Sequence, residues 1–337
     1  MGPSANELLK PCYIGLDIGG TKIAAGIVSQ DGQVLVSKSC PTPLPLGGQK
    51  ILLDSINLAA ELLRQSDRKV VGIGIGSGGQ IDCEKGVVRS ATPLLPNWEG
   101  IHITEAFNKE FGLEVAVDND VNVLALGEAQ FGAAAEVDKG TVVFLALGTG
   151  VGGALLTNGS LHHGANWSGG EFGHMLLTMD PNARRHAGGI PGTLEAYCSG
   201  SGLVQTWREL TGNTDLRITG EEIVADARQN PGGVSSLAIA KTGEYLGYGL
   251  VGLANALDPN LIVIGGGLGT IGDALLNPAR EVLNKLALAG PSRCPVVQAK
   301  LGVNAPIVGA GSLVMPKSEK FATKLSSQSA KIGSHLS

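Results

Sequence analysis

Three glycine-rich turns are the first features of this chain whose composition can do chemistry. Each follows an apolar segment, and the turns occupy residues 18–21, 148–153 and 265–269. Glycine in such a turn lets backbone N–H groups approach an anion closely and supplies positive φ angles. One turn alone is more typical of a tight hairpin, but three in one chain favour binding of a nucleotide polyphosphate. None has the P-loop pattern, and the third lacks the spacing of a dinucleotide fingerprint.

An acidic residue, Asp17, directly precedes the first turn. A carboxylate at this place can hold Mg²⁺ or its water ligands, with Thr21 and Lys22 near a phosphate. The competing interpretation is that Asp17 only caps the turn, and the residue types do not separate the two.

Polar residues also cluster at 118–122, which read Asp-Asn-Asp-Val-Asn between an expected strand and an expected helix. Asp118 is expected to cap the turn. Asp120 can accept the proton of a substrate hydroxyl as a general base. The alternative is that an Asp or Asn here does no more than cap the helix N-terminus.

A carboxylate and an imidazole, Glu171 and His174, lie three residues apart in a further glycine-rich loop, and Glu195 follows later in the chain. These groups suit a hydroxyl-rich ligand because they accept and donate several directed hydrogen bonds. A lone histidine is usually structural, but the pairing with Glu171 favours a ligand-binding site. Two such residues do not make a zinc site, which takes four ligands.

Alternating strands and helices are needed to position these residues, and the apolar patterns predict them. The expected strands cover residues 13–17, 22–28, 33–37, 70–75, 114–117, 142–147, 154–157 and 261–264, and the expected helices cover 51–65, 103–111, 121–131 and 245–257. A strand, a glycine turn and a second strand occur at the first turn and again at the second. We therefore predict an α/β fold with an internal duplication, in which two lobes face one another across a cleft.

The composition supports a packed globular chain and excludes several classes. The 337 residues include 51 glycines, but 43% are hydrophobic and only 16% are charged, so the chain can bury a large core. A formal net charge of −5 without a long basic run gives no electrostatic footprint for nucleic acid. The five scattered cysteines are typical of a reducing, cytoplasmic setting. The longest uncharged stretch, 141–170, is interrupted by glycines and is too short in its apolar part to span a membrane.

Together these residues resemble the ROK family of sugar kinases and sugar-responsive repressors, which has the actin-like ATPase fold. The resemblance runs from about Tyr13 to Val314. Residues 17–21 look like the family's first phosphate motif, residues 148–153 look like the second, and 265–267 with 309–311 resemble its adenosine side. The nucleotide and phosphate contacts that the resemblance implies are Asp17, Gly19, Gly20, Thr21, Lys22, Gly148, Thr149, Gly150, Gly152, Gly265, Gly266 and Gly267.

The resemblance also implies a sugar site. Asn119-Asp120 matches the family's Asn-Asp pair, which makes Asp120 the base for the sugar hydroxyl. Glu171, His174 and Glu195 match sugar-contacting positions. The full set of expected sugar-binding residues is Asn119, Asp120, Glu171, His174, Glu195 and Gly79.

Two departures from the family pattern bear on that site. Many members carry a Cys-x-Cys-Gly-x-x-Gly-Cys zinc motif before the position of Glu195, but the aligned residues 186–193 read His-Ala-Gly-Gly-Ile-Pro-Gly-Thr. His174 and His186 alone cannot complete a tetrahedral site, so we predict no structural zinc and a His174 that is available to the sugar. Gly78-Gly79 stands where many members have Pro-Gly, which leaves the identity of the sugar open.

The implied activity is that of a cytoplasmic, ATP- and Mg²⁺-dependent, glucokinase-like hexose kinase of glycolysis. It phosphorylates the C6 hydroxyl of glucose or a similar hexose, and Asp17 holds Mg²⁺ directly or through water. The alternatives are an N-acetylmannosamine or N-acetylglucosamine kinase, a fructokinase, polyphosphate as the donor and, outside this class, a non-catalytic sugar-sensing regulator. A homodimer is expected, with no nucleic-acid or membrane partner.

The expected domain organisation has three parts. An N-terminal α/β lobe covers 12–119, and a C-terminal α/β lobe covers 120–316, with a last helix that packs back on the first lobe. Residues 317–337 are Ser- and Lys-rich and are expected to form a disordered tail.

Overall fold

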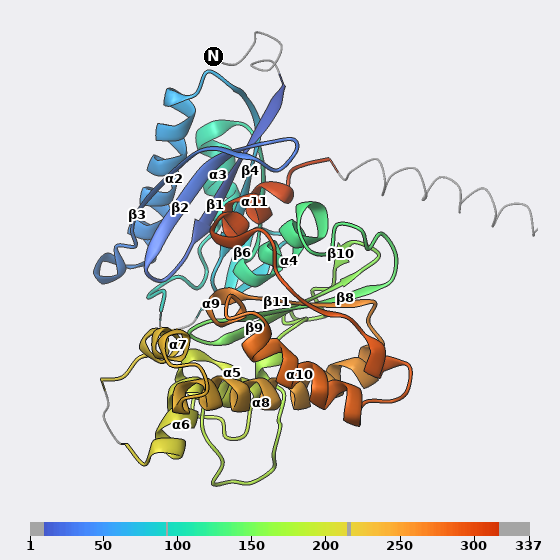
Figure 1. Cartoon of the computed structure of the whole chain (residues 1–337). Coiled ribbons are helices and arrows are strands. Elements are labelled where there is room, and N and C mark those ends of the chain that lie inside the picture. Colours follow the sequence, from blue (N-terminus) through green and yellow to red (C-terminus); the bar gives the residue numbers. More distant parts are fainter. Residues whose placement is uncertain (1–9, 92–93, 214–216, 317–337) are drawn as a thin grey trace, which may run out of the picture. The chain divides into compact units, whose positions relative to one another are not determined.

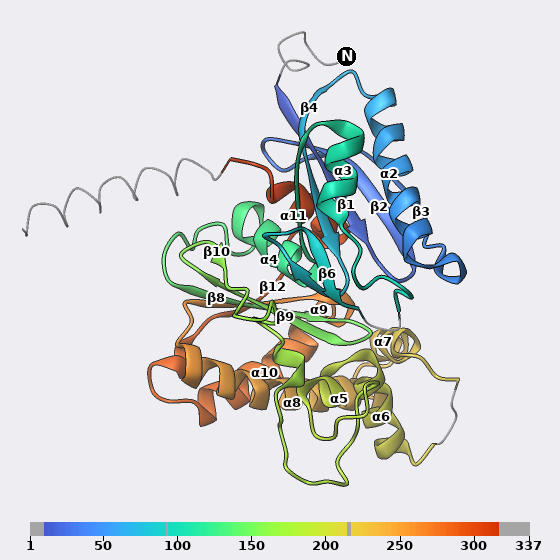
Figure 2. The same ribbon diagram turned by 180° about the vertical axis from the view of Figure 1, so that it is seen from behind.

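The computed structural model describes residues 10–91, 94–213 and 217–316 (Figures 1 and 2). Contacts divide the chain into two compact units. Unit 1 holds the described residues up to 138, together with 164–168 and those from 300 onward, and unit 2 holds 139–163 and 169–299. The expected boundary at 119/120 differs from this division, because the helix that follows Asn119 packs on the sheet of unit 1. The expected disordered tail, 317–337, lies outside the described residues.

Unit 1 is built on a mixed sheet with the strand order β3-β2-β1-β4-β7. β1 (Pro11–Ile18), β2 (Lys22–Ser29) and β3 (Val34–Pro41) are antiparallel neighbours, whereas β4 (Lys69–Ser77) and β7 (Glu114–Asn119) run parallel to β1. β5 (Gln80–Asp82) and β6 (Val87–Ser90) form a small separate sheet. The parallel strands bring their carboxyl ends to one edge, where the first glycine turn also lies.

Helices cover both faces of this sheet (Figures 1 and 2). α2 (Gly47–Gln65) and α3 (Ile103–Phe111) share one core with the strands, and α11 (Ala305–Ser312) and the end of α4 (Asp120–Phe131) share another. α2 and α3 follow the predicted apolar spacing, because their buried residues recur at helical intervals along one face. The last described helix thus packs on unit 1.

Part of the glycine excess serves this packing. A Cβ atom at Gly15 would lie 1.8 Å from the carbonyl oxygen of Ile307, and one at Gly74 would lie 1.8 Å from that of Ala310. Both contacts are impossible, so α11 lies directly on strand backbones that carry no side chain there. Gly309, expected on the adenosine side, is in the same situation, since its Cβ would lie 2.0 Å from the carbonyl oxygen of Val123.

Unit 2 repeats the topology of unit 1. β10 (Ser160–Leu161), β9 (Val151–Thr157) and β8 (Thr141–Leu147) are antiparallel neighbours, and β11 (Leu261–Gly265) and β12 (Val296–Gln298) continue the sheet in parallel orientation. The order β10-β9-β8-β11-β12 matches that of unit 1 strand for strand. The predicted internal duplication of an α/β lobe is confirmed.

The helices of unit 2 gather around α8 (Val234–Leu257), which contacts α5 (Leu194–Cys198), α6 (Gly200–Thr211), α7 (Gly220–Gln229) and α10 (Asp273–Leu286). The leucine spacing predicted a helix only from Tyr245 onward. α8 begins eleven residues earlier because Ala238, Ile239 and Thr242 continue the same buried face. None of the expected helices covers α5, α6, α7 or α10.

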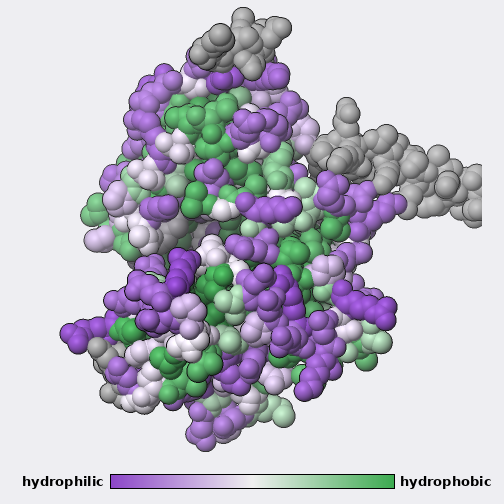
Figure 3. Space-filling view, viewed as in Figure 1, coloured by the Kyte–Doolittle hydropathy of each residue, from purple (hydrophilic) through white to green (hydrophobic). Residues whose placement is uncertain are grey.

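The third glycine run also differs from its prediction. Residues 266–269, expected as a turn, form the short helix α9 (Gly266–Gly269). None of the helices described here is both long and apolar enough to cross a membrane. On the face drawn in Figure 3, hydrophilic and hydrophobic residues are interspersed in both units.

Candidate active site

Strand register places the acidic residues of unit 1 along one edge of its sheet. Asp17 of β1 is paired with Gly76 of β4, and Gly76 is paired with Asp118 of β7. In the next row, Ile18 and Asn119 flank Ser77. The carboxyl ends of parallel strands are where α/β proteins bind ligands, so the register brings together the expected site residues of unit 1.

The carboxyl group of Asp17 has an unusual electrostatic setting. Burial, and next the repulsion from Asp120, raise its pKa to about 7, while Lys22 acts in the opposite direction. Such a carboxylate is stabilised by a nearby cation. Mg²⁺ is commonly held by one or two carboxylates together with substrate phosphates, so the donor set at Asp17 fits this ion.

The first glycine turn is fixed from outside by Thr42. The Thr42 hydroxyl donates to the Gly19 carbonyl at 2.6 Å, and its amide donates to the Thr21 carbonyl at 3.1 Å. Within the turn, the Gly19 amide donates to the Lys22 carbonyl at 3.1 Å. The side chains of Thr21 and Lys22 are exposed. The turn is therefore held by its carbonyl groups, and its exposed donors suit an anion.

Asn119 caps the N-terminus of α4. Asn119 Oδ1 accepts from the amides of Val121 at 2.9 Å and Asn122 at 3.3 Å, so Asn119 is the cap. Asp118 is buried and accepts from the Asn119 amide at 2.7 Å and from Asn122 Nδ2 at 2.8 Å. The capping interpretation therefore applies to Asn119 and Asp118. Asp120 lies in the first turn of α4 near Asp17, and its Oδ1 accepts from the Val121 amide at 3.0 Å.

Gly79 joins the same group of residues. Its carbonyl oxygen accepts from Asn119 Nδ2 at 3.0 Å, which brings two of the expected sugar-binding positions into contact. Gly79 has a φ of +104°, and a Cβ atom there would lie 2.4 Å from the Ser90 carbonyl oxygen. Both the backbone and the packing thus require glycine at this position.

In unit 2, Glu195 forms part of the second glycine turn. Its Oε2 accepts from the Val151 amide at 2.9 Å, and a Cβ atom at Gly150 would lie 2.5 Å from the same oxygen. Glu195 is in the first turn of α5, which the Thr193 hydroxyl caps at 3.3 Å from the Ala196 amide. From the sequence, Glu195 was expected to bind the sugar and the second glycine turn to bind phosphate. The direct contact between the Glu195 carboxylate and this turn was not expected.

The loop that carries Glu171 and His174 lies on β9. A Cβ atom at Gly173 would lie 2.0 Å from the Val151 carbonyl oxygen, so the loop backbone touches the strand. Burial, and to a lesser extent Glu195, raises the pKa of Glu171, whereas His174 lowers it. The structure thus brings Glu171, His174 and Glu195 close enough together for their charges to interact.

The third glycine run lies next to the second turn. Gly266 has a φ of +77°, and a Cβ atom there would lie 2.4 Å from the Leu147 carbonyl oxygen at the end of β8. By contrast, a Cβ atom at Gly148 or at Gly267 would meet no atom within 4 Å. Packing does not explain glycine at these two positions, and the close approach of a ligand would.

The residues around His174 do not fit a zinc site. The imidazole rings of His174 and His186 pack edge to face with centroids 5.2 Å apart. Gly188 has no ligand atom in its side chain, and the hydroxyl of Thr193 caps α5. Within the described residues, no three His, Cys, Asp or Glu side chains around these rings bring their ligand atoms within 4.8 Å. Four tetrahedral ligands cannot be assembled here.

Sequence reasoning missed one residue in this region. His186 Nδ1 lies 3.2 Å from Glu195 Oε1, so the histidine that was considered only as a metal ligand is a neighbour of an expected sugar-binding carboxylate. Nothing in the spacing of residues 186 and 195 predicts this contact, because an irregular loop brings the two together.

Comparisons with known proteins identify the family of this chain. The family model described as ROK family matches residues 13–317. The glucokinase of Streptomyces coelicolor is 34% identical over 319 residues, which cover 89% of this chain and 96% of that one. A solved ROK family glucokinase from Streptomyces griseus, in complex with glucose and AMPPNP, has a TM-score of 0.75 and 30% identity, over 90% of this chain and 98% of that one. The ROK hexokinase from Thermus thermophilus has a TM-score of 0.73 and 28% identity, over 89% and 97%.

Proposed function

Because the chain belongs to the ROK family and is a sugar kinase, we propose that it transfers the γ-phosphoryl group of ATP to the C6 hydroxyl of glucose or a similar hexose. The Streptomyces griseus relative holds glucose and AMPPNP, and the Thermus thermophilus relative is a hexokinase, which supports a nucleotide donor and a hexose acceptor.

The observation that carries the proposal is the position of Asp120. It lies in the first turn of α4, near Asp17, where its Oδ1 accepts from the Val121 amide, while Asn119 is the cap of the helix. A helix N-terminus favours negative charge. Asp120 is therefore suited to accept the proton of the sugar hydroxyl as the phosphoryl group is transferred.

The glycine turns supply the phosphate contacts in this proposal. The expected residues are Asp17, Gly19, Gly20, Thr21 and Lys22 in unit 1, and Gly148, Thr149, Gly150, Gly152, Gly265, Gly266 and Gly267 in unit 2. Mg²⁺, when bound, would neutralise charge on the phosphate oxygens. The protein's own contribution is then positioning and charge stabilisation, since phosphoryl transfer asks little covalent chemistry of it.

The hexose contacts are proposed to come from Asn119, Gly79, Glu171, His174 and Glu195. Carboxylates accept from sugar hydroxyls, and an imidazole donates to one and accepts from another. Since the residues around His174 do not fit zinc, we propose that this imidazole is available to the sugar. Stoichiometric zinc in the purified protein would contradict that.

The alternatives differ in substrate or in class. An N-acetylhexosamine kinase or a fructokinase keeps the same base and phosphate turns and changes only the sugar contacts. Polyphosphate as the donor would leave the adenosine side unused. A non-catalytic sugar sensor has no use for Asp120 near Asp17. A homodimer, a cytoplasmic location and a role in glycolysis stay predictions.

A substrate panel tests the proposal. The purified chain is assayed with Mg²⁺ and either ATP or polyphosphate against glucose, mannose, fructose, N-acetylglucosamine and N-acetylmannosamine, with the phosphorylated product identified by ³¹P NMR. We expect a 6-phosphate of glucose or a close hexose, made with ATP. Binding of a sugar without turnover under any of these conditions would support the sensor instead.

A further inference from the structure

The segment 176–192 of unit 2 is an irregular loop that is held in a defined shape by its own backbone. The Leu177 amide donates to the Gly192 carbonyl at 2.7 Å, and the Leu194 amide donates to the Met175 carbonyl at 2.8 Å, which closes the loop at its base. Farther out, Arg185 and Pro191 form an isolated bridge. A loop with these cross-links can position side chains, and Arg184 and His186 of this loop contact residues of the neighbouring helices.

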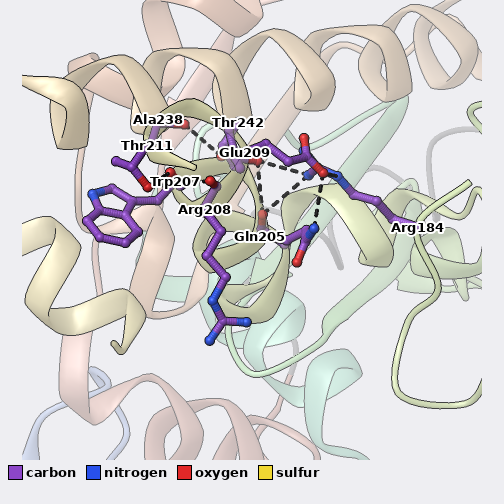
Figure 4. Close-up of polar contacts among 10 residues, drawn as sticks. Arg184, Gln205, Trp207, Arg208, Glu209, Thr211, Ala238 and Thr242 are labelled. Atoms are coloured by element: carbon purple, nitrogen blue, oxygen red, sulfur yellow. Dashed lines mark hydrogen bonds and ion pairs between the residues drawn. The ribbon is translucent and has the colours of Figure 1, made fainter. Parts of the chain in front are cut away.

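Arg184 contacts three helices, and Figure 4 shows its side chain directed at Glu209 of α6. Its Nε donates to Glu209 Oε1 of α6 at 3.0 Å, and Nη1 donates to Thr206 Oγ1 at 2.9 Å. The guanidinium group lies 4.8 Å from the ring centroid of Tyr197 in α5 and 5.2 Å from that of Tyr245 in α8. A paired and stacked guanidinium fixes the backbone that carries it, because the planar group has one orientation for both contacts.

His186 lies two residues beyond this anchor and faces Glu195. The residue is 7% exposed, and its Nδ1 lies 3.2 Å from Glu195 Oε1. The Gly188 amide donates to the same nitrogen at 3.0 Å. With a proton on Nδ1 the ring donates to Glu195 and connects the loop to the carboxylate, whereas without one it accepts from Gly188.

The second ring nitrogen of His186 indicates that this side chain is not there only to fill space in the core. His186 Nε2 is buried and has no hydrogen-bond partner among the described residues. A buried polar atom without a partner typically costs about 1–3 kcal/mol. An apolar side chain of similar size would avoid this cost, so the contacts of Nδ1 are what the imidazole provides here.

We propose that His186 is a positioning residue that sets the orientation of Glu195, and that Arg184 holds the loop on which His186 is mounted. Glu195 Oε1 faces His186 while Oε2 accepts from the Val151 amide of the second glycine turn. With the proton on Nδ1, one carboxylate oxygen is held from each side and the carboxylate keeps a single orientation. The effect on hexose affinity rests on the proposed function, whereas the effect on Glu195 itself does not.

The test compares two substitutions at position 186. His186→Leu removes both polar contacts. His186→Asn keeps them, since one amide group can donate to Glu195 and accept from Gly188 at the same time. Met179→Ala, at a 93% exposed site of the same loop, is the control. The hexose KM, the ATP KM, kcat and the melting temperature are measured for each variant, together with hydrogen exchange at the Val151 amide in the ligand-free protein.

We expect His186→Leu to raise the hexose KM roughly tenfold, in line with the loss of a hydrogen bond to a charged group, and to leave the ATP KM unchanged. Its melting temperature should stay the same or rise, its Val151 amide should exchange faster, and His186→Asn should restore both the KM and the exchange rate. A variant His186→Leu with unchanged hexose KM and unchanged exchange overturns the proposal. The proposal is also overturned if His186→Leu lowers the melting temperature and impairs the hexose KM, the ATP KM and kcat together, and if His186→Asn does not restore them. If the wild-type protein phosphorylates no sugar, the proposed function fails, and the exchange at Val151 still decides whether His186 positions Glu195.

Discussion

The raised pKa of Asp17 makes the ligand-free protein less stable than it would be without this charge. The pKa moves from 3.8 to about 7 on folding, which corresponds to roughly 4 kcal/mol between the two protonation states. Below about pH 4 the carboxyl group is protonated in both the folded and the unfolded chain, and it costs nothing. As the pH rises toward 7, the unfolded chain loses the proton first, so the free energy of unfolding falls; above 7 this contribution is constant.

Asp17→Asn removes that charge at every pH. We expect the variant to match the wild-type protein near pH 4 and to exceed its free energy of unfolding at pH 8 by up to roughly 4 kcal/mol. The measurement is urea unfolding at several pH values without nucleotide or Mg²⁺. Asp67→Asn, with a side chain that is 70% exposed, is the control and should stay within about 0.5 kcal/mol of the wild type. Equal stabilities at pH 8, or a difference that does not vary with pH, would refute the reasoning. The stabilised variant should nevertheless lose activity, because functional sites commonly retain charged groups that lower the stability of the folded protein.

Two further predictions concern the glycines. Gly15→Ala places a Cβ atom 1.8 Å from the Ile307 carbonyl oxygen and should lower the free energy of unfolding, measured in urea, by about 1–3 kcal/mol or more. Gly252→Ala is the control, because a Cβ atom at this position of helix α8 meets nothing within 4 Å, and it should raise the free energy of unfolding by about 0.5–1 kcal/mol. The reverse order of stabilities would contradict the packing of α11 against β1. Gly150→Ala brings a Cβ atom within 2.5 Å of Glu195 Oε2 and should raise the KM for both ATP and hexose, with little change in the far-UV circular dichroism. Unchanged kinetics would show that the turn and the carboxylate are not coupled.

The sequence predicted the repeated part of the fold well. Periodic apolar segments such as 103–111 correspond to helix α3 without a change in its bounds, and the strand–turn–strand repeat anticipated the matching order of the two sheets. The helices of unit 2 that the sequence did not predict have local explanations. The start of α7 carries a complete capping box, Thr219 with Glu222, which is a sequence signal for a helix N-terminus. The glycines at 266–269 form a helical turn, although glycine has a low helix propensity, because Gly266 is fixed against the end of β8.

The candidate site was predictable in its residue types and less so in its contacts. Asp17, Asn119 and Asp120 lie at strand and helix ends, where the pattern indicates ligand binding, and the sheet register then brings them together. The contact between Glu195 and Val151, and that between Glu195 and His186, depend on irregular loops whose course no periodicity describes. For the same reason the anchoring by Arg184 could not be inferred from its position in the sequence.

Single-turnover kinetics of Asp120→Asn, combined with direct measurement of hexose binding, tests the central claim most directly. The variant retains the shape of the side chain and removes the base, and a general base typically contributes about 10²–10⁴-fold to the rate. We predict a loss of phosphoryl transfer of at least roughly 100-fold with hexose affinity nearly unchanged, while Asp31→Asn, in the exposed β2–β3 turn, transfers at the wild-type rate. Phosphoryl transfer at the wild-type rate by Asp120→Asn would contradict the account.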